Sequence, residues 1–286
     1  MSLPTLLRKG FLIKPKNKDI IPVEYILDFL ENKLNSPPKN AGDRILVLKS
    51  STGSGKSTVL PDKLYEKFGD RRNICITQPR VLTAVDIPQD IVKYSKNLEL
   101  YKNIGFQTGN YTKLPQNKGV IFMTVGVLLQ QLITMEDELL MKKYQFILID
   151  EVHVGDLSTD ITLILLQKFL KKNWKEQFCP MIILMSATFD EKIFKKYFKT
   201  TNYIEIQGST YNIAEYFPKE DISDYYYYIS QKIYQIHTEN YADFNSDNAD
   251  FNSGNDDSSY DESQSLYRDI IVFIPTEKVG RDLIKR

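Results

Sequence analysis

The chain has 286 residues, of which 42% are hydrophobic and 26% charged, a balance typical of a folded globular protein. This composition excludes a wholly disordered chain and a fibrous repeat, and the absence of any run of eighteen apolar residues argues against a transmembrane helix. Two cysteines and two histidines are too few for a disulfide scaffold, a four-cysteine zinc site or a histidine-rich metal site. The N-terminus lacks the apolar core of a secretory signal, so we expect an intracellular, reducing compartment and no membrane partner.

Charge is unevenly distributed along the chain. Basic and acidic residues both number 37, which argues against a nucleic-acid binder of the strongly basic kind. Residues 238–267, however, include eight acids and no Lys or Arg, so the rest of the chain carries 37 bases against 29 acids, a net charge of +8. A moderately basic body with an acidic segment is compatible with phosphate-bearing partners, and a solvated surface without a specific partner is the alternative.

Helix and strand patterns alternate along the first part of the chain. Pro22–Leu34 is predicted to form an amphipathic helix, because apolar residues recur at helical spacing after a proline suited to the first turn. Short apolar runs, typical of strands buried on both faces of a parallel sheet, occur at 45–48, 73–77, 119–124, 146–150 and 181–185. Helical patterns lie between them, over 57–69, 125–133 and 159–169. The alternation predicts an α/β fold with a parallel sheet and right-handed crossovers.

The sequence changes character after about residue 205. A strand is predicted within 211–217, a tyrosine-rich helix over 223–237, a buried strand over 269–274 and a helix from about Glu277. Residues 239–266 are acidic and poor in aliphatic side chains, so we expect this insert to be disordered. The predicted organisation is an N-terminal helical extension (1–43), a first α/β domain (44–205) and a partial second α/β domain (206–286).

A glycine-rich loop joins the first buried strand to the helix that follows it. Its residues are Thr52, Gly53, Ser54, Gly55, Lys56, Ser57 and Thr58. The two glycines let the backbone wrap closely with its N–H groups inward, and the helix N-terminus adds positive potential. Lys56 can reach the β- and γ-phosphates of a nucleotide, and Ser57 can offer a hydroxyl to Mg²⁺. Although Ser50 stands where the full pattern has glycine, the strand–loop–helix context favours a phosphate loop over a turn without a ligand.

Two carboxylates, Asp150 and Glu151, follow the predicted strand 146–149. Ligands of parallel α/β sheets collect at the carboxyl ends of strands. Asp150 can hold Mg²⁺ through water, and Glu151 is placed to orient and deprotonate an attacking water. A helix-capping acidic pair is the alternative, and the upstream phosphate loop favours the catalytic interpretation. His153 forms no metal-ligand pair, because no second histidine lies on the same helical turn.

The segment Asp150-Glu-Val-His153 resembles motif II of superfamily 2 helicases of the DEAH/DEVH-box type. Other family motifs have counterparts in the same order: motif I at 52–58, motif Ia at 77–81, a segment of the same group at 105–109, motif Ib at 124–126 with Val125 in place of the usual Asp, motif III at 186–188 and the motif IV strand at 271–274. The resemblance spans about residues 44–275 and is nearest to poxvirus-like and DEAH-box RNA helicases. It implies a RecA-like P-loop NTPase domain over 44–205 that binds ATP and Mg²⁺, followed by an incomplete second RecA-like domain.

The resemblance also implies a nucleic-acid contact surface. Arg80, Thr124 and Gly126 match positions at which family members contact the nucleic-acid backbone. Such contacts position a strand without reading its sequence. The implied partner is RNA, with DNA left open. For Arg80 taken alone, an ordinary surface charge in a turn is the alternative. The amino-acid bias of the chain would suit a large DNA virus, which would place the protein in the host cytoplasm or the virion.

Three further residues are implied to couple the ATP site to domain movement. Ser186 and Thr188 match the motif III positions that transmit the ATP state, and His153 resembles the residue that contacts the second domain. A helix-capping Ser-Ala-Thr turn is the alternative for 186–188.

The ATP site of this family is completed by arginines of motif VI in the second RecA-like domain. Neither that motif nor motif V has a counterpart in the sequence, so we expect the arginines to come from a missing second-domain region or a partner subunit. A transition-state arginine is worth roughly 10³- to 10⁵-fold in hydrolysis. Two functions stay open: an ATP-dependent RNA helicase, and a truncated, non-catalytic nucleotide- and RNA-binding module. An unrelated P-loop kinase is disfavoured, because it does not account for motifs II and III together.

Overall fold

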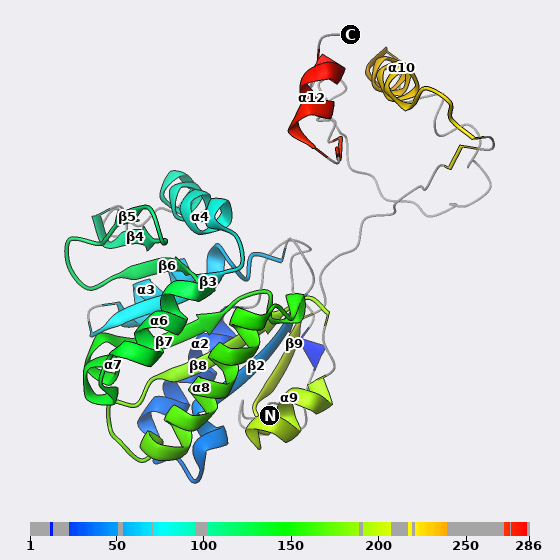
Figure 1. The fold of residues 1–286 in the computed structure, drawn as a ribbon. Coiled ribbons are helices and arrows are strands. Elements are labelled where there is room, and N and C mark those ends of the chain that lie inside the picture. The colour runs from blue at the N-terminus through cyan, green and yellow to red at the C-terminus, as the bar shows by residue number, and fades with distance from the viewer. Residues whose placement is uncertain are drawn as a thin grey trace, which may run out of the picture. The chain divides into compact units, whose positions relative to one another are not determined.

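The computed structural model describes residues 12–13, 23–50, 54–69, 71–94, 102–188, 191–206, 217–218, 221–238, 272–274 and 276–284. The chain divides into two compact units, residues 1–211 and 212–286. The first contains the sheet and its covering helices (Figure 1). The described residues of the second include the helices α10 (Tyr225–Thr238) and α12 (Glu277–Ile284).

A single sheet organises the first unit. Its described strands are β1 (Leu12–Ile13), β2 (Ile45–Ser50), β3 (Asn73–Gln78), β4 (Ile104–Gln107), β5 (Thr112–Lys113), β6 (Val120–Thr124), β7 (Tyr144–Ile149), β8 (Met181–Ser186) and β9 (Tyr203–Ile206). They are ordered β1-β9-β2-β8-β7-β3-β6-β4-β5. All neighbouring pairs are parallel except β4 with β5. The carboxyl ends of the parallel strands therefore lie along one edge of the sheet.

Helices cover both faces of this sheet (Figure 1). One face packs against α2 (Val23–Asn35), α3 (Val59–Phe68) and α4 (Val81–Tyr94). The other packs against α6 (Val125–Thr134), α7 (Asp137–Lys143), α8 (Leu157–Asn173) and α9 (Glu191–Phe198). Strand β2 illustrates the cause: Leu46 and Leu48 belong to the first core and Ile45 and Val47 to the second, because successive side chains of a strand point to opposite faces.

Most elements predicted from the sequence are confirmed. The five predicted strands of the first unit correspond to β2, β3, β6, β7 and β8, and the predicted helices to α2, α3, α6, α8, α10 and α12. Helix α3 begins at Val59, two residues later than expected, because residues 55–58 form a turn. Helix α4 was not predicted, and its interior Pro88 is the kind of residue that normally argues against a helix.

One element prediction is wrong. Residues 272–274 of the predicted strand 269–274 are not in a strand, and Phe273 is 92% exposed. The aliphatic run has the composition of a buried strand, yet a strand needs a hydrogen-bonding neighbour, and the described residues of the second unit provide none. The expected strand within 211–217 lies almost entirely outside the described residues, as does the acidic insert 239–266. The predicted division into three segments and the partial second RecA-like domain stay predictions.

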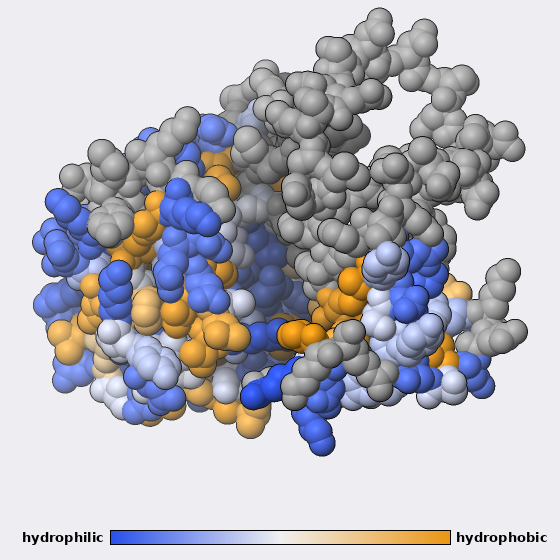
Figure 2. Space-filling model, turned by 90° about the horizontal axis from the view of Figure 1, so that it is seen from above, coloured by the Kyte–Doolittle hydropathy of each residue, from blue (hydrophilic) through white to orange (hydrophobic). Residues whose placement is uncertain are grey.

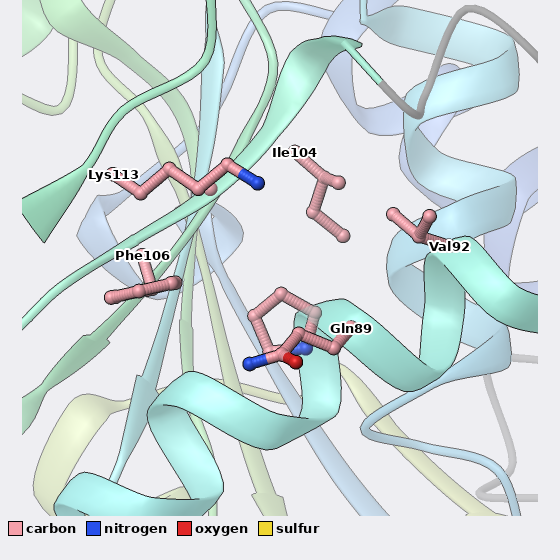
Figure 3. Close-up of a pocket in the computed structure, with 7 residues that line it drawn as sticks. Gln89, Val92, Ile104, Phe106 and Lys113 are labelled. Carbon is pink, nitrogen blue, oxygen red and sulfur yellow. The ribbon is translucent and has the colours of Figure 1, made fainter.

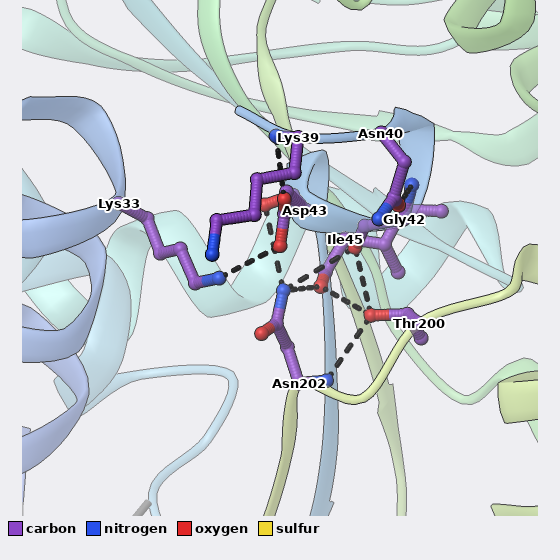
Figure 4. Close-up of polar contacts among 8 residues, drawn as sticks. All are labelled: Lys33, Lys39, Asn40, Gly42, Asp43, Ile45, Thr200 and Asn202. Atoms are coloured by element: carbon purple, nitrogen blue, oxygen red, sulfur yellow. Dashed lines mark hydrogen bonds and ion pairs between the residues drawn. The ribbon is translucent and has the colours of Figure 1, made fainter. Parts of the chain in front are cut away.

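A polar network holds β2 to the segment between α9 and β9 (Figure 4). The buried side-chain amide of Asn202 donates to the carbonyls of Gly42 (3.2 Å) and Ile45 (2.9 Å), and the Thr200 hydroxyl donates to the same two carbonyls. Asp43 accepts hydrogen bonds from the Lys33 ammonium (2.9 Å) and from the backbone N–H of Lys39 (2.7 Å). These contacts satisfy the backbone at the start of β2, opposite the edge where its carboxyl end lies.

None of the described helices combines the length and apolarity needed to cross a lipid bilayer. In the space-filling view of Figure 2, apolar and hydrophilic side chains of the coloured residues are interspersed over the face on view.

Candidate active site

Four polar residues lie where neighbouring strands end. Strands β2, β8, β7 and β3 are consecutive in the sheet and parallel. Ser50 ends β2, Ser186 ends β8, Gln78 ends β3, and Asp150 directly follows β7. The fold therefore brings residues that are far apart in the sequence to the same edge, where α/β proteins bind ligands.

The phosphate loop leads into α3 through a tight turn. Thr52 and Gly53 lie outside the described residues, which resume at Ser54. Gly55 has φ +83°, and a Cβ atom there would lie 2.9 Å from Cγ2 of Val59, so only glycine fits without strain. Its carbonyl accepts hydrogen bonds from the N–H groups of Thr58 (3.2 Å) and Val59 (2.8 Å). This turn places Lys56 and Ser57 directly before the helix.

Ser50, the departure from the glycine pattern, takes part in the loop. Its hydroxyl lies 2.6 Å from the hydroxyl of Ser54, and both side chains are buried. A hydrogen bond therefore joins the last residue of β2 to the loop, so the serine adds a contact that glycine cannot make.

Asp150 is the most densely hydrogen-bonded residue of the site. Its Oδ2 atom accepts from the Ser57 hydroxyl at 2.5 Å and from the Gln78 amide at 2.8 Å, and its Oδ1 from the N–H of Glu151 at 2.9 Å. Burial raises the pKa of Asp150 above its ordinary value, and the hydrogen bonds from Ser57 and Gln78 oppose that rise. In the described part of the chain no ion pair neutralises this carboxylate.

This donor set fits Mg²⁺. The Ser57 hydroxyl and the Asp150 carboxylate are hard oxygen ligands that converge on one point. The described residues contain no cluster of three His, Cys, Asp or Glu side chains around a metal-sized space. Mg²⁺ needs no such cage, because it usually binds one or two protein groups together with substrate phosphates and water.

Glu151 adopts a backbone conformation that is rare for a residue with a side chain, with φ 53° and ψ 41°. Its Oε1 atom lies 3.2 Å from Nζ of Lys56, and its Oε2 lies 3.2 Å from Nδ1 of His153. A left-handed residue of this kind costs of order 1–3 kcal/mol and is typical of functional sites. The turn directs the carboxylate back toward the phosphate loop.

A second set of contacts links this carboxylate to the end of β8. The Ser186 hydroxyl lies 3.0 Å from Nδ1 of His153 and accepts a hydrogen bond from the N–H of Thr188 at 3.2 Å. Ser186 is fully buried. The structure thus brings together the predicted coupling residues, and it joins them to Glu151 through His153.

The predicted nucleic-acid contacts lie beside this cluster, at the ends of β3 and β6. Gln78 and Thr124 are register partners in these neighbouring strands, and Arg80 follows the first of them. Arg80 and Gly126 are exposed, and Gly126 has open space where a side chain would begin. Thr124 precedes α6 without making a side-chain capping hydrogen bond. The three residues therefore share an accessible edge, and their role in binding stays a prediction.

Gln78 is a site residue that the sequence reasoning missed. It lay within the predicted motif Ia segment without an assigned role, and it donates directly to Asp150 across 72 positions of sequence. A polar residue that ends an otherwise buried strand, next to the strand carrying the acidic pair, was the available signal.

A parallel sheet with a phosphate loop after β2 and an acidic pair after β7 defines a RecA-like P-loop domain. Residues 36–196 match the family described as "DEAD/DEAH box helicase", and the chain belongs to that family. The fold agrees: the chain is similar to the crystal structure of the Escherichia coli DEAH/RHA helicase HrpB, with a TM-score of 0.52 and 22% identity over 66% of this chain and 22% of that one.

Two relatives are similar in sequence over most of this chain. The African swine fever virus protein B962L, which is named as an RNA helicase, is 34% identical in an alignment of 266 positions, and the alignment covers 84% of this chain. The human "ATP-dependent RNA helicase DHX30" is 33% identical in an alignment of 208 positions, and the alignment covers 71% of this chain. The matched regions make up 27% of B962L and 16% of DHX30, so the chain spans about a quarter or less of these relatives.

Proposed function

We propose that this chain is the ATP-binding part of an ATP-dependent RNA helicase that uses Mg²⁺. The observation that carries the proposal is the hydrogen bond of 2.5 Å between the Ser57 hydroxyl and Asp150, which unites the phosphate loop with the acidic pair in one site. Membership of the DEAD/DEAH box family and the RNA helicase names of its relatives support the substrate class.

In this proposal each residue of the cluster has one role. Lys56 and the backbone N–H groups of the loop hold the phosphates of ATP. Ser57 and Asp150 hold Mg²⁺, which supplies charge neutralisation for the transferring phosphoryl group. Glu151 orients the attacking water and takes its proton. Gln78 keeps the Asp150 carboxylate in position, since it donates to the same oxygen as Ser57.

We further propose that RNA contacts the edge formed by Arg80, Thr124 and Gly126. His153, Ser186 and Thr188 then transmit the ATP state from Glu151 to the end of β8. Close polar contacts support this role: Nδ1 of His153 lies 3.2 Å from Oε2 of Glu151 and 3.0 Å from the Ser186 hydroxyl, which accepts a hydrogen bond from the Thr188 N–H. Arginines from a second RecA-like domain or a partner subunit would neutralise charge on the transferring phosphoryl. Electrostatic stabilisation of that kind is usually the largest catalytic term.

The decisive experiment measures ATP binding and phosphate release, with and without single-stranded RNA. It compares the 286-residue chain with a longer version that carries a second RecA-like domain. We expect the short chain to bind ATP and hydrolyse it slowly, and the longer one to gain roughly three orders of magnitude in turnover. Glu151→Gln in the longer chain should abolish the gain while ATP stays bound.

Three results would contradict parts of this proposal. Failure of both chains to bind ATP would refute the assignment of the nucleotide site. Absence of hydrolysis in the longer chain would favour the non-catalytic binding module. Strong RNA-stimulated turnover by the short chain, at protein concentrations where it is monomeric, would remove the need for a second domain.

A further inference from the structure

A pocket lies away from the candidate active site, between α4 and the β4–β5 pair (Figure 3). Its volume is about 240 Å³, and Pro88, Gln89, Val92, Ile104, Gly105, Phe106 and Lys113 line it. No residue of the phosphate loop or of the acidic pair contributes to it, and the proposed ATPase function makes no use of it.

Glycine at position 105 shapes this pocket. A Cβ atom on Gly105 would lie 2.1 Å from the carbonyl oxygen of Lys113, so the missing side chain lets β5 approach β4 closely. Ile104 and Phe106 flank the glycine on β4, and Val92 faces them from α4 (Figure 3). The result is an apolar floor between a helix and the last strands of the sheet.

The rim of the pocket carries one positive charge, that of Lys113. The Lys113 side chain extends over the apolar floor (Figure 3), and no acidic side chain pairs with it among the described residues. Gln89 adds a side-chain amide at the opposite side. A ligand with an apolar group and an adjacent carboxylate would bury its apolar group in the pocket and pair its carboxylate with the Lys113 ammonium.

The volume decides the size of that occupant. Cavities of drug-sized ligands measure roughly 300–1,000 Å³, whereas benzene fills an engineered cavity of about 150 Å³. The pocket of about 240 Å³ lies between these limits and suits one large side chain, such as an aromatic ring.

The edge of the sheet is a second feature that favours a peptide as the ligand of this pocket. Strand β5 is the last strand of the sheet, and it pairs only with β4 among the described strands. Its outer N–H and C=O groups are therefore available for main-chain hydrogen bonds to an extended segment. The exposed side chains of Tyr111 (62%) and Leu114 (53%) directly precede and follow β5 in the chain.

We propose that this pocket binds a short linear segment of a partner protein, which inserts one aromatic side chain and pairs an adjacent acidic residue with Lys113. The segment runs along the outer edge of β5. This places a recruitment site on the ATP-binding unit, at a distance from its chemistry.

The test is a titration of the ¹⁵N-labelled 286-residue chain with capped tetrapeptides, followed by amide chemical shifts. The probes are acetyl-Ser-Phe-Asp-Ser-amide and the two variants with Ala for Phe or Lys for Asp. We expect the first peptide to shift the amides of Val92, Ile104, Gly105 and Lys113. Replacing Phe by Ala should weaken binding roughly tenfold or more, and replacing Asp by Lys roughly two- to fivefold.

Protein variants separate a specific pocket from general charge. Lys113→Glu should reverse the preference between the Asp and Lys peptides, and Lys118→Glu, an exposed residue outside the pocket, should not. Val92→Trp should fill the pocket and remove binding, while ATP affinity stays unchanged. Equal binding of all three peptides, or equal effects of the two lysine variants, would overturn the proposal.

Competing occupants give different results. Phenylacetate binding as tightly as the Phe-Asp peptide would identify a small-molecule site and overturn the peptide assignment. Displacement of the peptide by a single-stranded RNA oligonucleotide, with shifts at the same amides, would assign the surface to nucleic acid. A chain that does not bind ATP can still be titrated with the peptide, because the two sites share no residue. The proposed function and the peptide site can therefore be refuted independently.

Discussion

The ammonium of Lys56 lies 3.2 Å from the Oε1 atom of Glu151. Lys56 is only 4% exposed, and a buried cation of this kind is tolerated because a carboxylate accompanies it. The pair joins the residue proposed to hold phosphate to the residue proposed to activate water. A substitution of either residue therefore removes this ion pair and changes the surroundings of the other residue.

Replacing Lys56 by alanine should weaken ATP·Mg²⁺ binding by an order of magnitude or more, because a charge-assisted contact to phosphate is lost. A titration with a fluorescent ATP analogue measures the change. Lys63→Ala is the matched control, since Lys63 is an exposed lysine on α3 that pairs with Glu66. Equal affinities of the two variants would contradict the assignment of Lys56.

Replacing Ser186 by alanine should uncouple RNA from hydrolysis. The change removes the contact with His153 and the acceptor for the Thr188 N–H, while the phosphate loop is untouched. In a chain that carries both RecA-like domains, we expect RNA stimulation to fall about fivefold or more with ATP affinity unchanged. Steady-state phosphate release against RNA concentration gives the answer. Ser158→Ala on α8 is the control, and stimulation equal to that of the unmodified chain would refute the role.

Binding of single-stranded RNA should be weak, salt-sensitive and tolerant of sequence, because the proposed contacts are to the backbone. Arg80→Ala should lower the slope of log affinity against log salt by about 0.7. Arg71→Ala is the comparison, because Arg71 precedes β3 and lies at the opposite edge of the sheet. Fluorescence anisotropy at several salt concentrations measures both variants. Salt-independent or sequence-selective binding would count against this surface.

Asp43 should stabilise the first unit in a pH-dependent way. Burial opposes its ionisation, but hydrogen bonds from Lys33 and the Lys39 N–H outweigh burial and hold the pKa of Asp43 below its ordinary value of 3.8. Its stabilisation is therefore present above about pH 4 and is lost as the pH falls through the lowered pKa. Asp43→Asn should reduce the free energy of unfolding by about 1 kcal/mol at pH 7 and by less at pH 3.

The single tryptophan, Trp174, reports this unfolding, because its carbonyl accepts a hydrogen bond from Arg44 within the first unit. Denaturant titrations at pH 7 and pH 3 give the two free energies. Asp28→Asn is the control, since Asp28 pairs with Lys67 while 51% exposed and should change stability little. A loss at pH 3 as large as that at pH 7 would show that Asp43 acts through packing alone.

Local patterns in the sequence were sufficient to predict much of the fold. Strand β2, the glycine-rich segment 52–58 and helix α3 follow one another closely in the sequence, so a buried run, a glycine and a helix start are visible together. Asp150 was found for the same reason, as the first charged residue after a fully apolar strand. The α/β alternation then limited the fold class, because parallel strands need helical crossovers.

The same local reasoning failed where a segment depends on its neighbours. The run 272–274 has the composition of a strand but lacks a pairing partner among the described residues. Helix α4 contains Pro88, and burial of Ala84 and Ile91 against the sheet outweighs the poor local propensity.

The sequence by itself determined which residues carry charge and phosphate-binding chemistry, because those properties belong to single side chains and short loops. Only the tertiary structure decided how they meet. The order β2-β8-β7-β3 brings Gln78 to Asp150 and Ser186 to His153, and the left-handed backbone at Glu151 turns its carboxylate to Lys56. These relations depend on the pairing of distant strands and on a backbone angle imposed by packing, neither of which has a local pattern in the sequence.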